Sequence, residues 1–176
     1  WTVISNGPVS WEGDVASTAI DYPLSTYLVA LCAGPYHEVT DTWRGELTAH
    51  PEGKPAQKLE VPLGIYCRAS LAHALDAERL FTETKQGFDF YHRNFGFPYP
   101  FGKYDQIFVP EFNAGAMENA GCVTIRDEYV FTSQATHYKY ERRADTVLHE
   151  LAHMWFGDLV TMQWWDDLWL NESFAT

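Results

Sequence analysis

The stretch His149-Glu150-Leu151-Ala152-His153 reads H-E-x-x-H, and Glu172 follows with eighteen residues between it and His153. On a helix, residues four apart lie one above the other on the same face, so the two imidazoles can point at one ion. Glu150 lies one step around the helix, where it can contact a water on that ion but is poorly placed as a ligand. Glu172 can return from a second helix to complete the set. Two imidazoles and one carboxylate, with a fourth position open, are typical of a catalytic zinc site rather than a structural one.

The residues around this motif are largely apolar, so the helix that carries it should be mostly buried. Thr146-Val147-Leu148 precede the motif, and Met154-Trp155-Phe156 follow it. Buried polar side chains need partners, and a metal ion supplies them for imidazoles. We therefore expect a metal-site helix from Arg142 to Phe156 with Gly157 at its C-terminal end. A second helix, from Asp166 to Thr176, should carry the third ligand.

The composition indicates a folded protein and disfavours several classes of partner. Of the 176 residues, 46% are hydrophobic and 16% aromatic, which is enough to build a sizeable core. The formal net charge of -12 argues against binding to a nucleic-acid backbone. No apolar run approaches eighteen residues, so we expect no membrane-spanning segment in this chain.

The cysteines suggest a cytoplasmic protein. The two ends of the chain suggest a fragment of a larger protein. Cys32, Cys67 and Cys122 are widely spaced, and their odd number fits reduced thiols better than a disulfide framework. One disulfide between two of these cysteines, with the third as a free thiol, is an alternative that the sequence leaves open. The chain begins at Trp1, without an initiator Met or a leader, and ends at Thr176 inside an expected helix.

The first seventy residues carry the signals of β-strands. Ser25–Cys32 is a short apolar run rich in β-formers, and Thr40–Leu47 and Glu60–Ala69 are further candidate strands. The polar stretch His50–Pro55 between the last two is predicted to be an exposed hairpin turn. We interpret residues 1–71 as the end of an antiparallel β domain.

The pattern changes near residue 72, where helical periodicity begins. Asp76–Asn94 is predicted to be an amphipathic helix from apolar residues at three- and four-residue steps. Tyr104–Val109 and Cys122–Ile125 are predicted strands, and Pro110–Gly121 between them is a loop or a sheet edge. The fold class is therefore α+β, with a domain boundary between residues 71 and 72.

A second motif, Gly115-Ala116-Met117-Glu118-Asn119, ends thirty residues before His149 of the metal-site helix. By itself it would be a small-residue turn with one carboxylate. Together with H-E-x-x-H and the downstream Glu172, it resembles the signature of the aminopeptidase N family of zinc peptidases. The flanks Pro110-Glu111-Phe112-Asn113-Ala114 and Trp155-Phe156-Gly157-Asp158-Leu159-Val160-Thr161 resemble those of bacterial members.

The resemblance implies one zinc ion, held by His149, His153 and Glu172, with Glu150 as the general base. It also implies that residues 72–176 are the first part of a thermolysin-like catalytic domain that follows a β-rich N-terminal domain. Family members carry a transition-state-stabilising Tyr downstream of the third zinc ligand, and no Tyr of this chain is assigned that role.

The resemblance further implies how a peptide substrate with a free N-terminus is bound. Glu118 matches the carboxylate that binds the free α-amine. The rest of the motif matches the strand-like segment along the substrate backbone, namely Gly115, Ala116, Met117 and Asn119. A fixed carboxylate is a direct way to recognise an ammonium group, and it places the first peptide bond at the metal.

Two other kinds of function stay open at this point. One is a related zinc hydrolase, such as an endopeptidase or an epoxide hydrolase. The epoxide-hydrolase branch is expected to have Gly at the position of Ala116, so the sequence leans away from it. The other is a non-catalytic peptide-binding protein, whose usual mark is the loss of a ligand or of the base.

Overall fold

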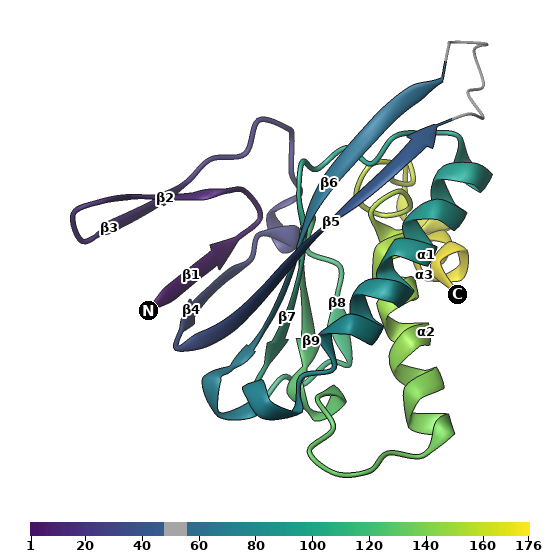
Figure 1. The fold of residues 1–176 in the computed structure, drawn as a ribbon. Coiled ribbons are helices and arrows are strands. Elements are labelled where there is room, and N and C mark those ends of the chain that lie inside the picture. Colours follow the sequence, from purple (N-terminus) through teal and green to yellow (C-terminus); the bar gives the residue numbers. More distant parts are fainter. Residues whose placement is uncertain (48–55) are drawn as a thin grey trace.

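A computed structural model describes residues 1–47 and 56–176 of the chain (Figure 1). The predicted hairpin turn at residues 50–55 lies outside the described residues. Helices and sheets are combined in one α+β arrangement, as the sequence predicts. Within the described residues, no helix is both long enough and apolar enough to cross a membrane.

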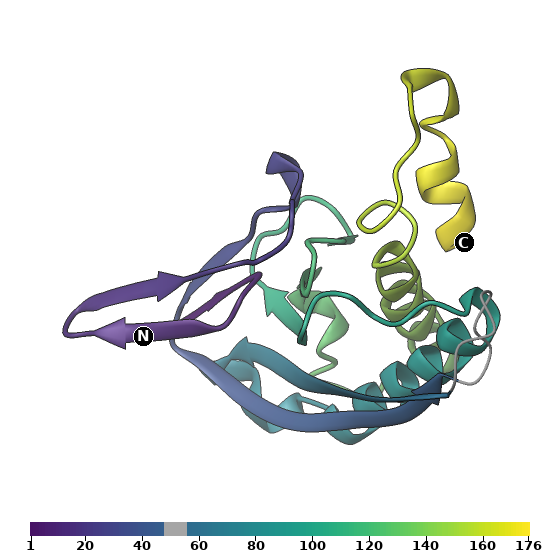
Figure 2. The same cartoon turned by 90° about the horizontal axis from the view of Figure 1, so that it is seen from above.

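Two small antiparallel sheets form the N-terminal part. β1 (Thr2–Ser5) pairs with β4 (Leu31–Gly34), and β2 (Val9–Glu12) pairs with β3 (Val15–Thr18). Figures 1 and 2 show the β2–β3 hairpin on the side of the molecule opposite α1 and α2. All three cysteines are free thiols, so the alternative with one disulfide does not occur.

The predicted strand over Ser25–Cys32 is wrong except at its last two residues. The chain there forms the short 3₁₀ helix η1 (Thr26–Leu28), and the strand β4 begins at Leu31. The Leu28 side chain is buried, whereas its neighbours Tyr27 and Val29 are exposed. The backbone N–H of Leu28 donates to the Ser25 carbonyl at 3.0 Å. Burial of one side chain in a tight turn therefore overrides the β propensity of this run.

The main sheet has five strands in the order β5-β6-β7-β9-β8. β5 (Tyr36–Leu47) and β6 (Gln57–Arg68) are antiparallel along their whole length. β5 includes the predicted strand Thr40–Leu47, and β6 includes all of the predicted strand Glu60–Ala69 except its last residue. β7 (Tyr104–Val109) is parallel to both β6 and β9 (Cys122–Arg126), and the two-residue strand β8 (Ala116–Met117) is antiparallel to β9 at the edge.

The centre of this sheet is parallel because a helix connects β6 to β7. That helix, α1 (Ala77–Phe95), matches the predicted one closely and ends at Gly96, which adopts the left-handed conformation with φ of 64°. The predicted boundary at residues 71/72 falls in the 3₁₀ helix η2 (Ala69–Ala74). β6 lies before this boundary and β7 after it, and the two strands pair in one sheet. The domain border itself stays a prediction.

The predicted metal-site helix, α2 (His137–His153), packs against α1, with which it shares the main hydrophobic core. Gly87 on α1 allows the close approach, because a β-carbon there would lie 2.6 Å from Leu148 and 2.8 Å from Leu151. Tyr91 adds a hydrogen bond to the Leu148 carbonyl at 2.8 Å. The core beneath α2 includes the buried residues Leu80, Phe88, Tyr104, Phe108, Ile125, Leu151, Met154 and Trp155.

Both predicted C-terminal helices differ from the observed ones in length. α2 begins at His137 rather than at residue 142, because Thr136 caps it by accepting from the Lys139 backbone N–H at 3.4 Å. The second helix is interrupted. It consists of the 3₁₀ turn η4 (Trp165–Asp167) and the short helix α3 (Leu170–Ala175), where residues 166–176 were expected to be continuous.

Candidate metal centre and substrate site

The last turn of α2 brings two imidazoles together. His149 and His153 have their Nε2 atoms 3.0 Å apart and their ring planes at 86° to each other. The His153 side chain is fully buried, whereas that of His149 is partly exposed. Two nitrogen atoms therefore face a common point that lies beside solvent, as the four-residue spacing predicts.

Glu172 on α3 supplies a third donor atom to the same point. Its Oε2 lies 3.3 Å from Nε2 of His149 and 3.6 Å from Nε2 of His153. In a tetrahedral zinc site with bonds of about 2.0–2.1 Å, neighbouring donor atoms are roughly 3.3–3.4 Å apart. The three donor atoms all lie within 4.8 Å of one another, so their chemistry and spacing fit one divalent ion. Their role as ligands stays a prediction.

The surroundings of His153 prepare its ring to bind a cation. Nδ1 faces the backbone carbonyl of Phe156 at 2.9 Å, which favours the tautomer with the proton on Nδ1 and leaves the Nε2 lone pair free. The turn that presents this carbonyl continues to Gly157, whose φ is 121°. A β-carbon at Gly157 would collide with the side-chain oxygen of Asn171 and lie 3.3 Å from Nδ1 of His153. Only glycine fits this turn without displacing the site.

Glu150 is buried beside the two imidazoles, only 5% exposed. Its Oε2 has no hydrogen-bond partner in the part of the chain that the structure describes. Burial, together with the nearby carboxylates of Glu118 and Glu172, raises the pKa of Glu150 to about 8. A divalent cation at the neighbouring donor atoms opposes this shift, because it favours the ionised carboxylate. The unused oxygen can accept a hydrogen bond from a water in the site.

The second motif lies at the edge of the main sheet. Ala116 and Met117 form β8, and the Gly115 carbonyl accepts a hydrogen bond from the Arg126 backbone N–H at 3.0 Å. β8 is the last strand in the sheet order of the described residues. Its outer edge can therefore pair with an extended peptide backbone.

The two polar residues of this motif have different surroundings. Glu118 is buried, and its Oε1 lies 3.5 Å from the side-chain nitrogen of Asn171. The Asn119 amide donates within its own turn, to Thr124 Oγ1 at 3.1 Å and to the Cys122 carbonyl at 3.3 Å. Glu118 thus faces the site, whereas Asn119 holds the turn in shape.

Two further residues at the site were not assigned from the sequence. Asn171 donates to Glu172 Oε1 at 3.3 Å as well as to Glu118, so it joins the metal-site acid to the second motif. Asp158 is a buried carboxyl whose two oxygens lack partners among the described residues, and burial, then Glu118 and Glu150, raises its pKa to about 9. A lone Asn or Asp next to a motif carries no spacing signal, so only the folded arrangement identifies them.

Comparison with known proteins identifies the class to which this fold and site belong. A sequence model described as the peptidase family M1 domain matches residues 80–176, which is more than half of the chain. The chain therefore belongs to peptidase family M1, a family of hydrolases that act on peptide bonds.

Among individual proteins, the chain is similar to three aminopeptidases from distant organisms. It is 59% identical to the aminopeptidase N of Streptomyces lividans over 177 residues, which covers all of this chain and 19% of that protein. It is 36% identical to the glutamyl aminopeptidase of Sus scrofa, over all of this chain and 18% of that protein. It is 39% identical to the leucyl aminopeptidase of Saccharolobus solfataricus, over 99% of this chain and 21% of that protein. The chain spans about a fifth of the length of these relatives.

Proposed function

We propose that the complete protein is a zinc-dependent aminopeptidase that removes the N-terminal residue from peptides with a free N-terminus. The observation that carries this proposal is the convergence of His149, His153 and Glu172 on one point beside two buried carboxyls. Membership of family M1 and the aminopeptidase names of the three relatives support the reaction class. Location in the cytoplasm stays a prediction.

The side chains of α2 and α3 would hold the ion and move the proton. His149, His153 and Glu172 would hold zinc, which when bound polarises the scissile carbonyl and acidifies water. Glu150 accepts the proton of the attacking water on its free Oε2 and later passes it to the nitrogen of the leaving amine.

The second motif would set which peptide bond is cleaved. Glu118 is a buried carboxylate that can bind the α-ammonium group of a substrate by a charge-assisted hydrogen bond. Along β8, the backbone of residues 115–117 can pair with the substrate as an added strand. With the amine fixed at Glu118, the first peptide bond lies at the metal ligands.

A related zinc hydrolase is the second candidate, and the recognition of the free amine distinguishes the two. Replacing Glu118 with Ala should weaken the preference for a free over an acetylated N-terminus roughly 10- to 100-fold, the worth of one charge-assisted hydrogen bond. The measurement is kcat/KM of the complete protein on matched free and acetylated aminoacyl-anilides.

The matched control is Glu128→Ala. Glu128 is a carboxylate on η3 (Asp127–Tyr129) with 75% of its side chain exposed and one surface contact to Arg126 at 3.5 Å. This variant should keep the preference of the wild type. If the wild-type protein cleaves acetylated peptides at internal bonds, the protein is an endopeptidase and not an aminopeptidase. A protein that binds zinc and peptides without turnover would be a peptide-binding module.

A further inference from the structure

The side chain of Asn6, at the end of β1, connects three segments that are far apart in the sequence. It is only 2% exposed. Its Nδ2 donates to the carbonyls of Leu28 at 2.8 Å and Ala120 at 2.9 Å, and its Oδ1 accepts from the backbone N–H of Ala30 at 2.8 Å. Both donor hydrogens of the amide are therefore used, one toward the N-terminal sheet region and one toward the second motif.

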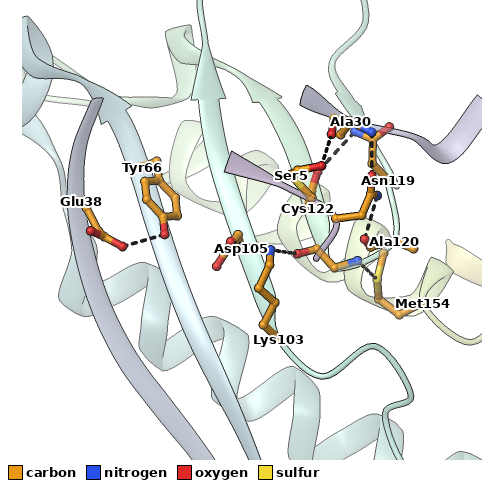
Figure 3. Close-up of polar contacts among 12 residues, drawn as sticks. Ser5, Ala30, Glu38, Tyr66, Lys103, Asp105, Asn119, Ala120, Cys122 and Met154 are labelled. Carbon is orange, nitrogen blue, oxygen red and sulfur yellow. Dashed lines mark hydrogen bonds and ion pairs between the residues drawn. The ribbon is translucent and has the colours of Figure 1, made fainter. Parts of the chain in front are cut away.

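The bond to Ala120 acts directly on the proposed amine-binding segment. Ala120 follows Asn119 and lies two residues after Glu118, in a turn closed by the Cys122 backbone N–H and the Asn119 carbonyl at 2.8 Å. Figure 3 shows Asn119 and Ala120 next to Ser5 and Ala30 of the N-terminal region. Movement of the Ala120 carbonyl would therefore move the backbone that carries Glu118.

Two further contacts hold this turn, one from Lys103 beside β7 and one from Met154 at the end of α2. Lys103 donates through Nζ to the Gly121 carbonyl at 3.0 Å, and the Gly121 backbone N–H lies 3.5 Å from Sδ of Met154, just beyond α2 (Figure 3). These contacts anchor the turn to the sheet and to the metal-site helix. The Asn6 amide anchors it to the N-terminal region.

The other hydrogen bonds of the Asn6 amide hold the segment at the C-terminal end of η1. Leu28 is the last residue of η1 and Ala30 follows two residues later, whereas the exposed ring of Tyr27 is in the middle of η1. Burial, and then the carboxylates of Glu118, Asp158 and Glu172, raises the pKa of the Tyr27 phenol.

We propose that Asn6 is a positioning residue for substrate binding, whose amide sets the Glu118 carboxylate at a fixed place relative to the metal ligands. This inference rests on the proposed function. The hydrogen bonds of the Asn6 side chain go to Leu28, Ala30 and Ala120, and none goes to Glu150 or to the three candidate ligands. Its loss should therefore impair binding of the amine and leave the chemical step intact. The effect should appear in KM and in the preference for a free N-terminus.

Ser5 offers a matched control because it makes a similar bond that stops short of the second motif. Its Oγ donates to the Ala30 carbonyl at 2.8 Å, and the side chain is also buried. Ser5→Ala therefore removes a buried hydrogen bond from the same β1 junction without removing a contact to residues 115–121. It reports the cost of losing one buried hydrogen bond at this junction that does not reach the second motif.

The experiment compares Asn6→Ala, Asn6→Ser and Ser5→Ala in the complete zinc-loaded protein. We expect both Asn6 variants to raise KM for a free-amine aminoacyl-anilide on the order of tenfold. The ratio of kcat/KM for the free-amine substrate to that for the acetylated substrate should fall by the same factor. Their kcat and zinc content should stay within about twofold of the wild type. Ser5→Ala should leave KM and the preference unchanged and should lower Tm less than the Asn6 variants, because it removes one hydrogen bond and not three.

Several results would overturn the inference. An unchanged KM in the Asn6 variants with a lowered Tm would make the residue purely structural, as would an equal rise of KM in Ser5→Ala. Asn6 variants that never fold would make it a folding determinant instead. The proposed aminopeptidase function is tested separately by the wild-type protein. If the wild type shows no preference for the free-amine substrate, the proposed function is wrong, whatever the Asn6 variants do.

Discussion

The Glu150→Gln variant should bind zinc as the wild type does and lose nearly all turnover. The substitution preserves the size of a side chain that is 5% exposed and packed beside the imidazoles, so the fold and the ligands remain in place. It removes the group that accepts a proton from water, and general base catalysis contributes about 10²- to 10⁴-fold in rate. We therefore expect kcat on an aminoacyl-anilide to fall by at least about 100-fold, with zinc content unchanged.

The control for this prediction is Glu141→Gln on the same helix. Its side chain is 64% exposed and lies 3.2 Å from Nδ1 of the exposed His137. This variant should retain wild-type kcat, KM and zinc content. Near-normal turnover in Glu150→Gln would contradict the assignment of the base, and loss of zinc from that variant would show that Glu150 acts as a ligand.

Removal of the metal should abolish activity and lower thermal stability together. A ligand that binds only the folded state stabilises it by about 2.7 kcal/mol at a concentration one hundred times its Kd. Two of the donor atoms are on α2 and the third is on the short helix α3, so the ion would tie these elements together. The measurement is turnover and Tm of the complete protein before chelation, after chelation and after addition of zinc.

The Glu150→Gln variant separates the two effects of the metal. It should regain the full increase of Tm when zinc is added after chelation, without regaining activity. Cobalt and manganese suit the same donor set and are expected to restore part of the turnover. Retention of activity by fully chelated protein, or an unchanged Tm, would contradict a metal-dependent site.

The elements that the sequence predicts well are those with a strong local pattern. α1 and β7 follow the prediction to within a residue or coincide with it, because periodic apolar residues and helix-ending glycine and proline act over short distances. The three candidate ligands also converge as predicted, since a four-residue helical spacing fixes the geometry of His149 and His153. Motif spacing therefore carries information about the site as well as about the fold.

The rest depends on contacts between distant segments, which local patterns do not encode. The parallel pairing of β6 with β7 follows from a crossover connection, and η1 replaces a predicted strand because Leu28 is buried. Asn6 and Ala120 are 114 residues apart in the sequence, and Asn171 reaches Glu118 across 53 residues. A single polar residue gives no sign in the sequence of the partner that it will meet.

X-ray absorption at the zinc edge, with metal analysis of the complete protein, tests the central claim most directly. One zinc per chain is expected, bound by two nitrogen donors at about 2.0–2.1 Å and oxygen donors at about 2.0–2.2 Å. In Glu172→Ala the affinity for zinc should fall by at least about tenfold. No stoichiometric metal, a thiolate ligand at about 2.3 Å, or wild-type binding in Glu172→Ala would contradict a site built from His149, His153 and Glu172.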